Sequence, residues 1–208
     1  MSKPSGARPA CADGENSIVS PGLRRAVFLD RDGTVIVDTL FSTDPARLEP
    51  MPGAVEALRR LQEAGFLLVI ITNQSGVARG YFTEEDLDAF HRHMADWFAQ
   101  RDVRLAGVYF CPHHPDGTTP ALSCACDCRK PAPGMILRAA RELNVDPAAS
   151  WMVGDRDADV GAGRAAGCRT IRVAGSSEGN GLAADFDAPD LAAAADRILS
   201  SAHGRAPG

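Results

Sequence analysis

The sequence predicts an α/β fold built on a doubly wound, mainly parallel β-sheet. Short apolar runs alternate along the chain with segments whose apolar residues recur at helical spacing, the pattern of strands joined by crossover helices. The apolar runs are continuous, as expected of strands that are covered on both faces. Three runs end at or next to a reactive side chain, namely Asp30, Thr72 and Asp155. We expect the functional site there, because ligands bind beyond the carboxyl ends of such strands.

The first half of the chain contains three predicted strands and two predicted helices. The first helix carries Leu58 and Leu61 on one face and ends before Gly65, a common C-terminal stop. Thr83 is a favourable N-cap for a longer helix, whose apolar stripe runs from Leu87 to Phe98. The elements in order are a strand at 26–30, a helix at 53–64, a strand at 66–71, a helix from Thr83 and a strand at 105–110.

The second half alternates in the same way after one long irregular segment. Residues 111–133 show neither helical nor strand periodicity and include four of the six cysteines. A loop of this length inside a compact domain needs an explanation. The predicted elements that follow are a helix at 134–143, a strand at 151–153, a short helix that ends at Gly167, a strand at 170–173, a loop at 174–188 and a helix at 191–199.

The composition indicates one globular domain with an acidic balance. The chain has 208 residues, 45% of them apolar, and a net charge of −5, which disfavours nucleic acid or an anionic membrane as a partner. Residues 1–24 are rich in Pro, Gly, Ser and Ala, so we expect a disordered leader before a domain at 25–203. The longest apolar run, 66–71, is far shorter than the roughly 20 residues of a membrane span. The leader lacks the apolar core of a signal peptide, so we expect a cytoplasmic protein.

Two carboxylates follow the first predicted strand. Asp30 and Asp32 precede Gly33 in a turn that can aim both side chains at one point. Because the two charges repel, the site needs a cation, and Asp155 would complete an oxygen site suited to Mg²⁺. An ionised carboxylate can attack phosphorus without a base to activate it. Taken alone, the Asp-Arg-Asp-Gly run is equally well explained as a polar turn.

Four motifs in order resemble a known superfamily. FLDRDGT, IITN, Lys130 and GDRDAD are similar to the motifs of the haloacid dehalogenase-like (HAD) phosphatases. The resemblance implies a Rossmann-like fold in which Asp30 is the nucleophile and Asp32 is the general acid and later the base. It implies that Mg²⁺ is held by the Asp30 carboxylate, the Asp32 main-chain carbonyl and Asp155. Thr72 and Lys130 would then hold the transferring phosphoryl oxygens, whose charge is best met by donors fixed in advance.

The irregular segment contains a Cys-x-His pair and a Cys-x-Cys pair. Three sulfurs and one imidazole form a closed tetrahedral Zn²⁺ site of the structural type. Free thiols or a disulfide are the alternatives, and Cys124 or His114 could replace an assigned ligand. A metal clamp would fix Arg129 and Lys130, which follow it directly. The expected ligands, within a zinc loop at 111–128, are Cys111, His113, Cys126 and Cys128.

The same loop narrows the resemblance. CPHHPDG and CDCRKPAPGM, together with LDRDGT and TNQSGVARGYF, are similar to the D-glycero-D-manno-heptose-1,7-bisphosphate 7-phosphatases over about residues 26–175. This resemblance implies removal of the C7 phosphate through an aspartyl-phosphate intermediate, during synthesis of nucleotide-activated heptose for lipopolysaccharide or other surface glycans. It leaves the preferred anomer open. The substrate contacts that it implies are Asp38, Thr39, Leu40, Phe41, Thr72, Asn73, Gln74, Ser75, Arg129, Lys130 and Arg156.

The spacing of the motifs predicts an open cleft. The stretch between Asp32 and Thr72 holds one helix and has no room for a separate cap domain. Arginines beside the motifs, such as Arg31, fit a doubly phosphorylated small molecule. Arg79 is equally well explained as solvated surface. The role of Asp159 is open: it could support Asp155, or it could be a favourable negative charge at the N-terminus of a helix. No long exposed apolar stripe is evident, so we expect a monomer.

Three rival functions have separate tests. A histidinol-phosphate phosphatase would share the chemistry, and kinetics with both phosphates would distinguish it. A nucleic-acid 3′-end phosphatase is disfavoured by the acidic balance and by the lack of a basic and aromatic stripe, and it predicts salt-dependent affinity for DNA ends. A non-catalytic zinc-stabilised module is disfavoured by the complete set of motifs, and it predicts no phosphatase activity with Mg²⁺.

Overall fold

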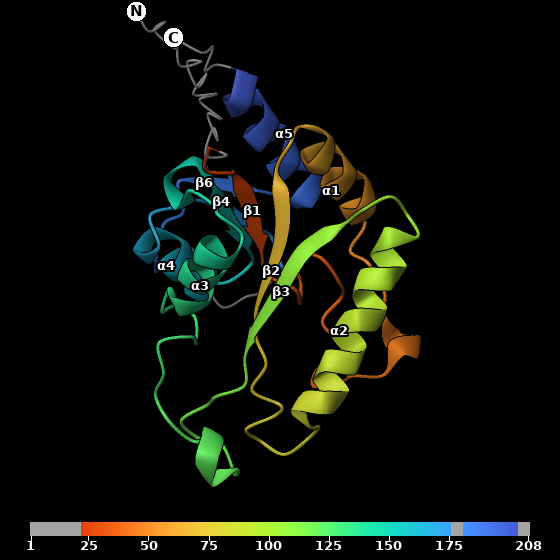
Figure 1. Ribbon diagram of the computed structural model, residues 1–208, viewed down its shortest axis with the longest axis vertical. Coiled ribbons are helices and arrows are strands. Elements are labelled where there is room, and N and C mark those ends of the chain that lie inside the picture. The colour runs from red at the N-terminus through yellow and green to blue at the C-terminus, as the bar shows by residue number, and fades with distance from the viewer. Residues whose placement is uncertain (1–21, 176–180, 204–208) are drawn as a thin grey trace, which may run out of the picture.

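The structure is a computed structural model that describes residues 22–175 and 181–203. Its six-stranded sheet has the order β3-β2-β1-β4-β5-β6, and all neighbouring strands are parallel (Figure 1). The predicted parallel α/β fold is thus confirmed. The strands are β1 (Ala26–Leu29), β2 (Leu67–Asn73), β3 (Leu105–Cys111), β4 (Trp151–Gly154), β5 (Arg169–Val173) and β6 (Phe186–Ala188).

Helices cover both faces of the sheet, which produces two apolar cores. Val27 and Leu29 of β1 belong to one core, whereas Phe28 between them belongs to the other. Because both faces of β1 are buried, its sequence is apolar throughout rather than alternating. The first core lies under α1 (Ala54–Glu63), α2 (Glu84–Ala99) and α5 (Leu191–His203), and the second lies under α3 (Gly134–Glu142) and α4 (Asp157–Ala165) (Figure 1).

Helix α2 begins where the sequence predicts. The Thr83 hydroxyl accepts a hydrogen bond from the backbone N–H of Asp86, and the Asp86 carboxylate accepts one from the backbone N–H of Thr83. This reciprocal pair satisfies two N–H groups that the first helical turn leaves without partners. Phe90, Met94 and Phe98 of the predicted stripe are buried in the first core. Their burial fixes which face of α2 points toward the sheet.

The segment between β1 and α1 contains no cap domain. Residues 30–53 are all described, and their only helix is a short 3-10 turn at Pro45–Arg47. Ile36 forms isolated bridges with Asp32 and Pro50, so the segment folds back on itself. Within this described segment, therefore, no domain covers the cleft, as the spacing of the motifs predicts.

Two details differ from the prediction. The predicted loop at 174–188 contains β6, which pairs with β5 at the sheet edge. This strand has only three residues, too few for a recognisable apolar pattern. The predicted leader includes Arg24, which forms a parallel bridge with Val145. Residues 1–21 of that leader lie outside the described part of the chain.

No helix of the described residues is long and apolar enough to cross a membrane.

Candidate active site

A cavity of about 520 Å³ opens at the carboxyl ends of β1 and β2. It is lined by Asp30, Asp32 and Asp159 together with the residues predicted to contact substrate. Ser42 also lines the cavity and lies outside every motif, whereas Asp157, another lining residue, lies within GDRDAD and was given no role from the sequence. The predicted contacts that line the cavity are Asp38, Thr39, Leu40, Phe41, Thr72, Asn73, Gln74, Ser75, Arg129, Lys130 and Arg156.

Three buried carboxylates gather beside the cavity. Asp30 follows β1, Asp155 follows β4, and Asp159 lies in the first turn of α4. Each offers an oxygen within 4.8 Å of the others. The pairing of β1 with β4 explains this meeting, since the backbone N–H of Asp30 donates to the carbonyl of Val153 at 2.9 Å. Strand pairing therefore brings together residues that are far apart in the sequence.

Two glycines let the backbone approach these carboxylates. Gly33 has a φ of +80°, and a Cβ atom there would lie 2.9 Å from Oδ2 of Asp155. A Cβ at Gly154 would overlap the side chain of Asp159. Any larger residue at either position would push a carboxylate out of the group. The lack of a side chain at these two motif positions thus has a steric explanation.

Lys130 supplies the positive charge inside this group. Its Nζ lies 2.6 Å from Oδ1 of Asp30 and 2.5 Å from Oδ1 of Asp159, and it donates to the Ile71 carbonyl at 2.8 Å. The side chain of Asn73 holds the backbone of Lys130 by two hydrogen bonds, of 3.1 and 3.0 Å. A buried cation with these partners is fixed in position.

The electrostatics of the group favour an added cation. Burial raises the pKa of Asp30 to about 7, because the effects of Asp159 and Asp32 add to desolvation and Lys130 only partly opposes them. Burial also raises the pKa of Asp155, again with a contribution from Asp159. Three carboxylates facing one ammonium leave an excess of negative charge. Such a set of hard oxygen donors fits Mg²⁺, and Asp30 and Asp155 would hold it.

Asp159 takes the helix N-terminal role, one of the two that the sequence left open, and it also pairs with Lys130. Its Oδ1 pairs with Nζ of Lys130, and its Oδ2 accepts from the backbone N–H of Arg156 at 3.0 Å. The second contact closes the N-terminus of α4. One carboxylate therefore joins the start of the helix to the buried lysine.

Asp32 points to different partners from Asp30. Both of its carboxylate oxygens lie 3.1 Å from Nε of Arg31, and Oδ2 accepts from Nε2 of Gln74 at 2.9 Å. The same amide donates to Oγ1 of Thr72 at 2.8 Å. Asp30 and Asp32 therefore both line the cavity but contact different side chains, so they can have different roles.

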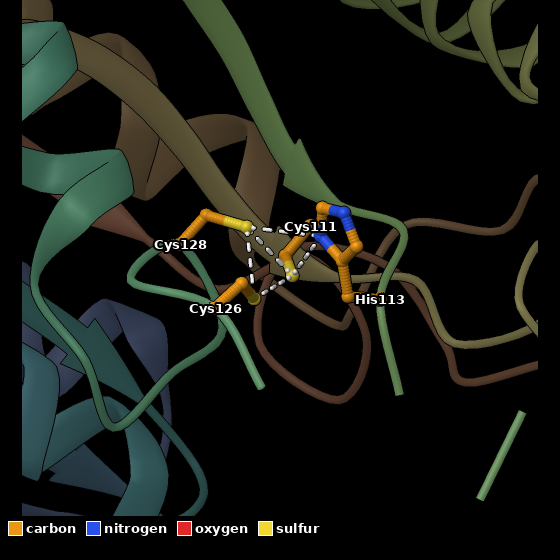
Figure 2. Close-up of side chains that lie close together, drawn as sticks. All are labelled: Cys111, His113, Cys126 and Cys128. Carbon is orange, nitrogen blue, oxygen red and sulfur yellow. Dashed lines mark hydrogen bonds between the residues drawn. The ribbon is translucent and has the colours of Figure 1, made fainter. Parts of the chain in front are cut away.

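Four ligand atoms of the irregular loop face one another, as Figure 2 shows for Cys111, His113, Cys126 and Cys128. The sulfur of Cys128 lies 3.0 Å from that of Cys111, 3.2 Å from that of Cys126 and 3.3 Å from Nδ1 of His113. Three thiols and one imidazole in this arrangement fit Zn²⁺. Cys124 is exposed and His114 lies against Arg79, and neither belongs to the group.

The surroundings favour the protonated form of two of the three thiols. Burial raises the pKa of Cys128 to about 11 and raises that of Cys111 further. Burial opposes ionisation of Cys126 too, but hydrogen bonds from Cys128 and from the Arg129 backbone lower its pKa. A bound Zn²⁺ would deprotonate all three sulfurs.

The loop leads directly to the cavity. Nη1 of Arg129 donates to the carbonyl of His113 at 3.2 Å, so the ligand loop and the cationic segment are joined. The backbone N–H of Gly134 donates to the carbonyl of Asp127 at 2.9 Å. The orientation of Arg129 and Lys130 thus depends on the path of this loop.

Apolar side chains stand at the rim of the cavity. Leu40 and Phe41 are exposed, and both have a positive φ. The ring of Tyr81 lies 4.8 Å from that of Phe41. Beside them, Nη2 of Arg156 lies 3.4 Å from Oδ2 of Asp38. The rim therefore joins the segment after β1 to the loops after β2 and β4.

Comparison with known proteins identifies the family. A family profile described as HAD-hyrolase-like matches residues 127–200. The D-glycero-beta-D-manno-heptose-1,7-bisphosphate 7-phosphatase of Yersinia pestis is 52% identical over 146 residues, which cover 70% of this chain and 77% of that protein. The chain belongs to the D-glycero-D-manno-heptose-1,7-bisphosphate 7-phosphatase family. The family resemblance found in the sequence is confirmed.

Solved structures agree with this membership. D,D-heptose 1,7-bisphosphate phosphatase from B. bronchiseptica, crystallised with magnesium and phosphate, is 35% identical with a TM-score of 0.72 and covers 85% of this chain and 99% of that one. A HAD-like phosphatase from Mesorhizobium loti is 33% identical with a TM-score of 0.78 and covers 90% and 91% of the two chains. The HAD fold is therefore confirmed over most of the chain.

Proposed function

We propose that this protein is a Mg²⁺-dependent phosphatase that removes the C7 phosphate of D-glycero-β-D-manno-heptose 1,7-bisphosphate. The observation that carries the proposal is the buried cluster of Asp30, Asp155, Asp159 and Lys130 at an uncapped cavity. The relatives at 47–52% identity are named for the β anomer, and we assign the same preference to this chain. Its product would enter the synthesis of nucleotide-activated heptose.

The reaction uses two neighbouring carboxylates. An oxygen of Asp30 attacks the C7 phosphorus and forms an aspartyl phosphate, while the bond from phosphorus to the C7 oxygen breaks. Asp32 donates a proton to the leaving alkoxide. Asp32 then takes a proton from a water molecule, which attacks phosphorus and releases phosphate and the free Asp30 carboxylate. Asp32 accepts hydrogen bonds from Arg31 and Gln74, whereas Asp30 pairs with Lys130, and these different partners support different roles for the two carboxylates.

The phosphoryl group would be held by fixed donors. The cavity that Asp30 lines is also lined by Lys130 and Thr72, which offer Nζ and Oγ1 as donors. Asp30, the Asp32 carbonyl and Asp155 would hold Mg²⁺, which reduces the repulsion between the carboxylate nucleophile and the anionic phosphoryl group. Arg129 and Arg156 remain to meet the rest of a doubly charged substrate.

The cysteine loop is proposed to hold a structural Zn²⁺. The donor set supports zinc, and a closed site of four protein ligands supports a structural role. Thiolate ligands are stable in a reducing compartment, which supports a cytoplasmic location. We also propose a monomer. Three of the exposed large apolar side chains in the described residues, Leu40, Phe41 and Tyr81, belong to the cavity rim. Their exposure is explained by the cavity and does not require a second copy of the chain.

Steady-state kinetics test the function. With Mg²⁺ present, we expect kcat/KM for the β anomer of the heptose bisphosphate to exceed that for histidinol phosphate and 4-nitrophenyl phosphate by at least about tenfold, because cationic side chains on the cavity wall select a second phosphate. We expect it to exceed that for the α anomer as well, in line with the anomer for which the relatives are named. Phosphate release is the measurement. A preference for histidinol phosphate would overturn the proposed substrate. No activity with any of the four phosphate esters would overturn the enzyme class.

A further inference from the structure

A buried chain of polar groups connects α2 to the reacting end of β1. Nη1 of Arg31 lies 3.0 Å from Nε2 of His91, a residue separated from it by 60 positions. On its other side, Arg31 contacts both carboxylate oxygens of Asp32 through Nε, and Oδ1 again through Nη2 at 3.0 Å. Arg31 and His91 are 4% and 6% exposed. Water therefore cannot readily replace the contact between Arg31 and His91.

The direction of the contact between Arg31 and His91 follows from chemistry. A guanidinium only donates, so Nε2 of His91 must accept through its lone pair and the proton of the neutral ring lies on Nδ1. Burial and then the charge of Arg31 lower the pKa of His91 to about 3, which agrees with a neutral ring. Phe110 lies 5.6 Å from the imidazole, and Phe90 lies 5.3 Å from the guanidinium, measured to the ring centroids. The pair is thus enclosed by aromatic rings.

We propose that His91 is a positioning residue for the phosphatase reaction, because it holds the Arg31 guanidinium in place against the Asp32 carboxylate. This role rests on the proposed function, in which Asp32 transfers the protons. Without the imidazole acceptor, an N–H group of a buried guanidinium loses its partner. The arginine then gains freedom to turn away from Asp32. Gln74 still holds the same carboxylate at 2.9 Å, so we expect slower proton transfer rather than complete loss.

The test compares two substrates that differ in their need for an acid. Hydrolysis of the heptose bisphosphate expels a poor alkoxide leaving group, whereas 4-nitrophenyl phosphate expels a stable phenolate that needs no proton. For His91→Phe we expect kcat/KM, which reports phosphoryl transfer to Asp30 and not the later attack of water, to fall roughly tenfold on the heptose bisphosphate and less than about twofold on the aryl phosphate. His91→Gln restores an acceptor near the position of Nε2 and is expected to recover most of the kcat/KM.

Asp32→Asn serves as the reference for this pattern. It should show the same selective loss on a larger scale. If Asp32→Asn lowers kcat/KM equally for both substrates, the assigned role of Asp32 as the acid fails, and that of His91 fails with it. If Asp32→Asn is selective but His91→Phe lowers both substrates equally, or neither, the role of His91 alone is overturned.

A measurement on the unsubstituted protein keeps the inference testable should His91→Phe fold poorly. In ¹⁵N NMR spectra, His91 should be a neutral ring with an unprotonated Nε2 throughout pH 5.5 to 8, assigned by the loss of its signals in His91→Gln. A protonated ring, or a proton on Nε2, would remove the acceptor on which the contact with Arg31 depends.

Discussion

The acidic group and the cysteine loop lie at the same end of the sheet but are held there by different means. Asp30 and Asp155 follow directly after paired, fully buried strands. The loop from 112 to 133 has only a short 3-10 helix at Pro120–Leu122, and its fixed point is a set of thiols and one imidazole. Backbone pairing is thus enough to assemble the carboxylates, whereas the loop depends on side chains that a metal would join.

The two regions meet at Lys130. Its ammonium belongs to the acidic group, and its backbone comes two residues after the thiol of Cys128. Asn73 of β2 holds that backbone from the sheet side. Substitutions in each region, and in the link between them, can therefore distinguish the loss of a reacting group from the misplacement of Lys130.

The largest effect is expected from the acidic group. Asp30→Asn should lower kcat by at least about 10⁴-fold, because an amide cannot serve as the nucleophile. The fold should survive, since an amide of equal size replaces one carboxylate in an excess of negative charge. Phosphate release and circular dichroism are the measurements. Substantial turnover by a pure, folded variant would contradict the assignment of Asp30.

The cysteine loop should respond in both stability and activity. Cys126→Ser removes one of the four ligand atoms, so we expect zinc content to fall from one per chain toward zero and the melting temperature to fall by about 10 °C. Activity should fall roughly tenfold or more, because Arg129 and Lys130 lose their fixed path.

Cys124→Ser is the matched control for that loss. Cys124 is an exposed thiol of the same loop and lies outside the ligand group, so its zinc content, melting temperature and activity should match those of the parent protein. Full activity in zinc-free Cys126→Ser would show that the loop does not position the cations. Loss of zinc in Cys124→Ser would change the ligand assignment.

The smallest effect is expected at the link between the regions. Asn73→Ala removes two hydrogen bonds to the Lys130 backbone. We expect the free energy of unfolding to fall by about 1–3 kcal/mol and kcat/KM to fall roughly tenfold, while zinc content is unchanged. Denaturant unfolding and kinetics are the measurements.

Gln62→Ala provides the control, because the Gln62 side chain also makes two backbone hydrogen bonds, to Asp102 and Arg104, away from the cavity. It should lose stability without loss of activity. Equal activity losses in both variants would show that Asn73 acts only through general stability.

Much of the fold and of the site could be predicted from local patterns. Continuous apolar runs revealed the five longer strands, and Thr83 revealed the start of α2. Residues in the last positions of a strand or just after it, such as Asp30, Thr72 and Asp155, were recognised as a possible site because parallel strands end at one edge. The strand β6 carried no such signal, since three residues are too few for a period.

Apolar runs, turns and motifs are local properties of the chain, so the sequence was enough to predict which residue types follow each strand. The pairing of their side chains depends on how the helices pack against the sheet. Asp159 joins the start of α4 to Lys130, and His91 reaches Arg31 across 60 residues. No local pattern contains such contacts, since they arise when α2 and α4 pack on opposite faces of the sheet and bring distant polar groups into one water-poor space.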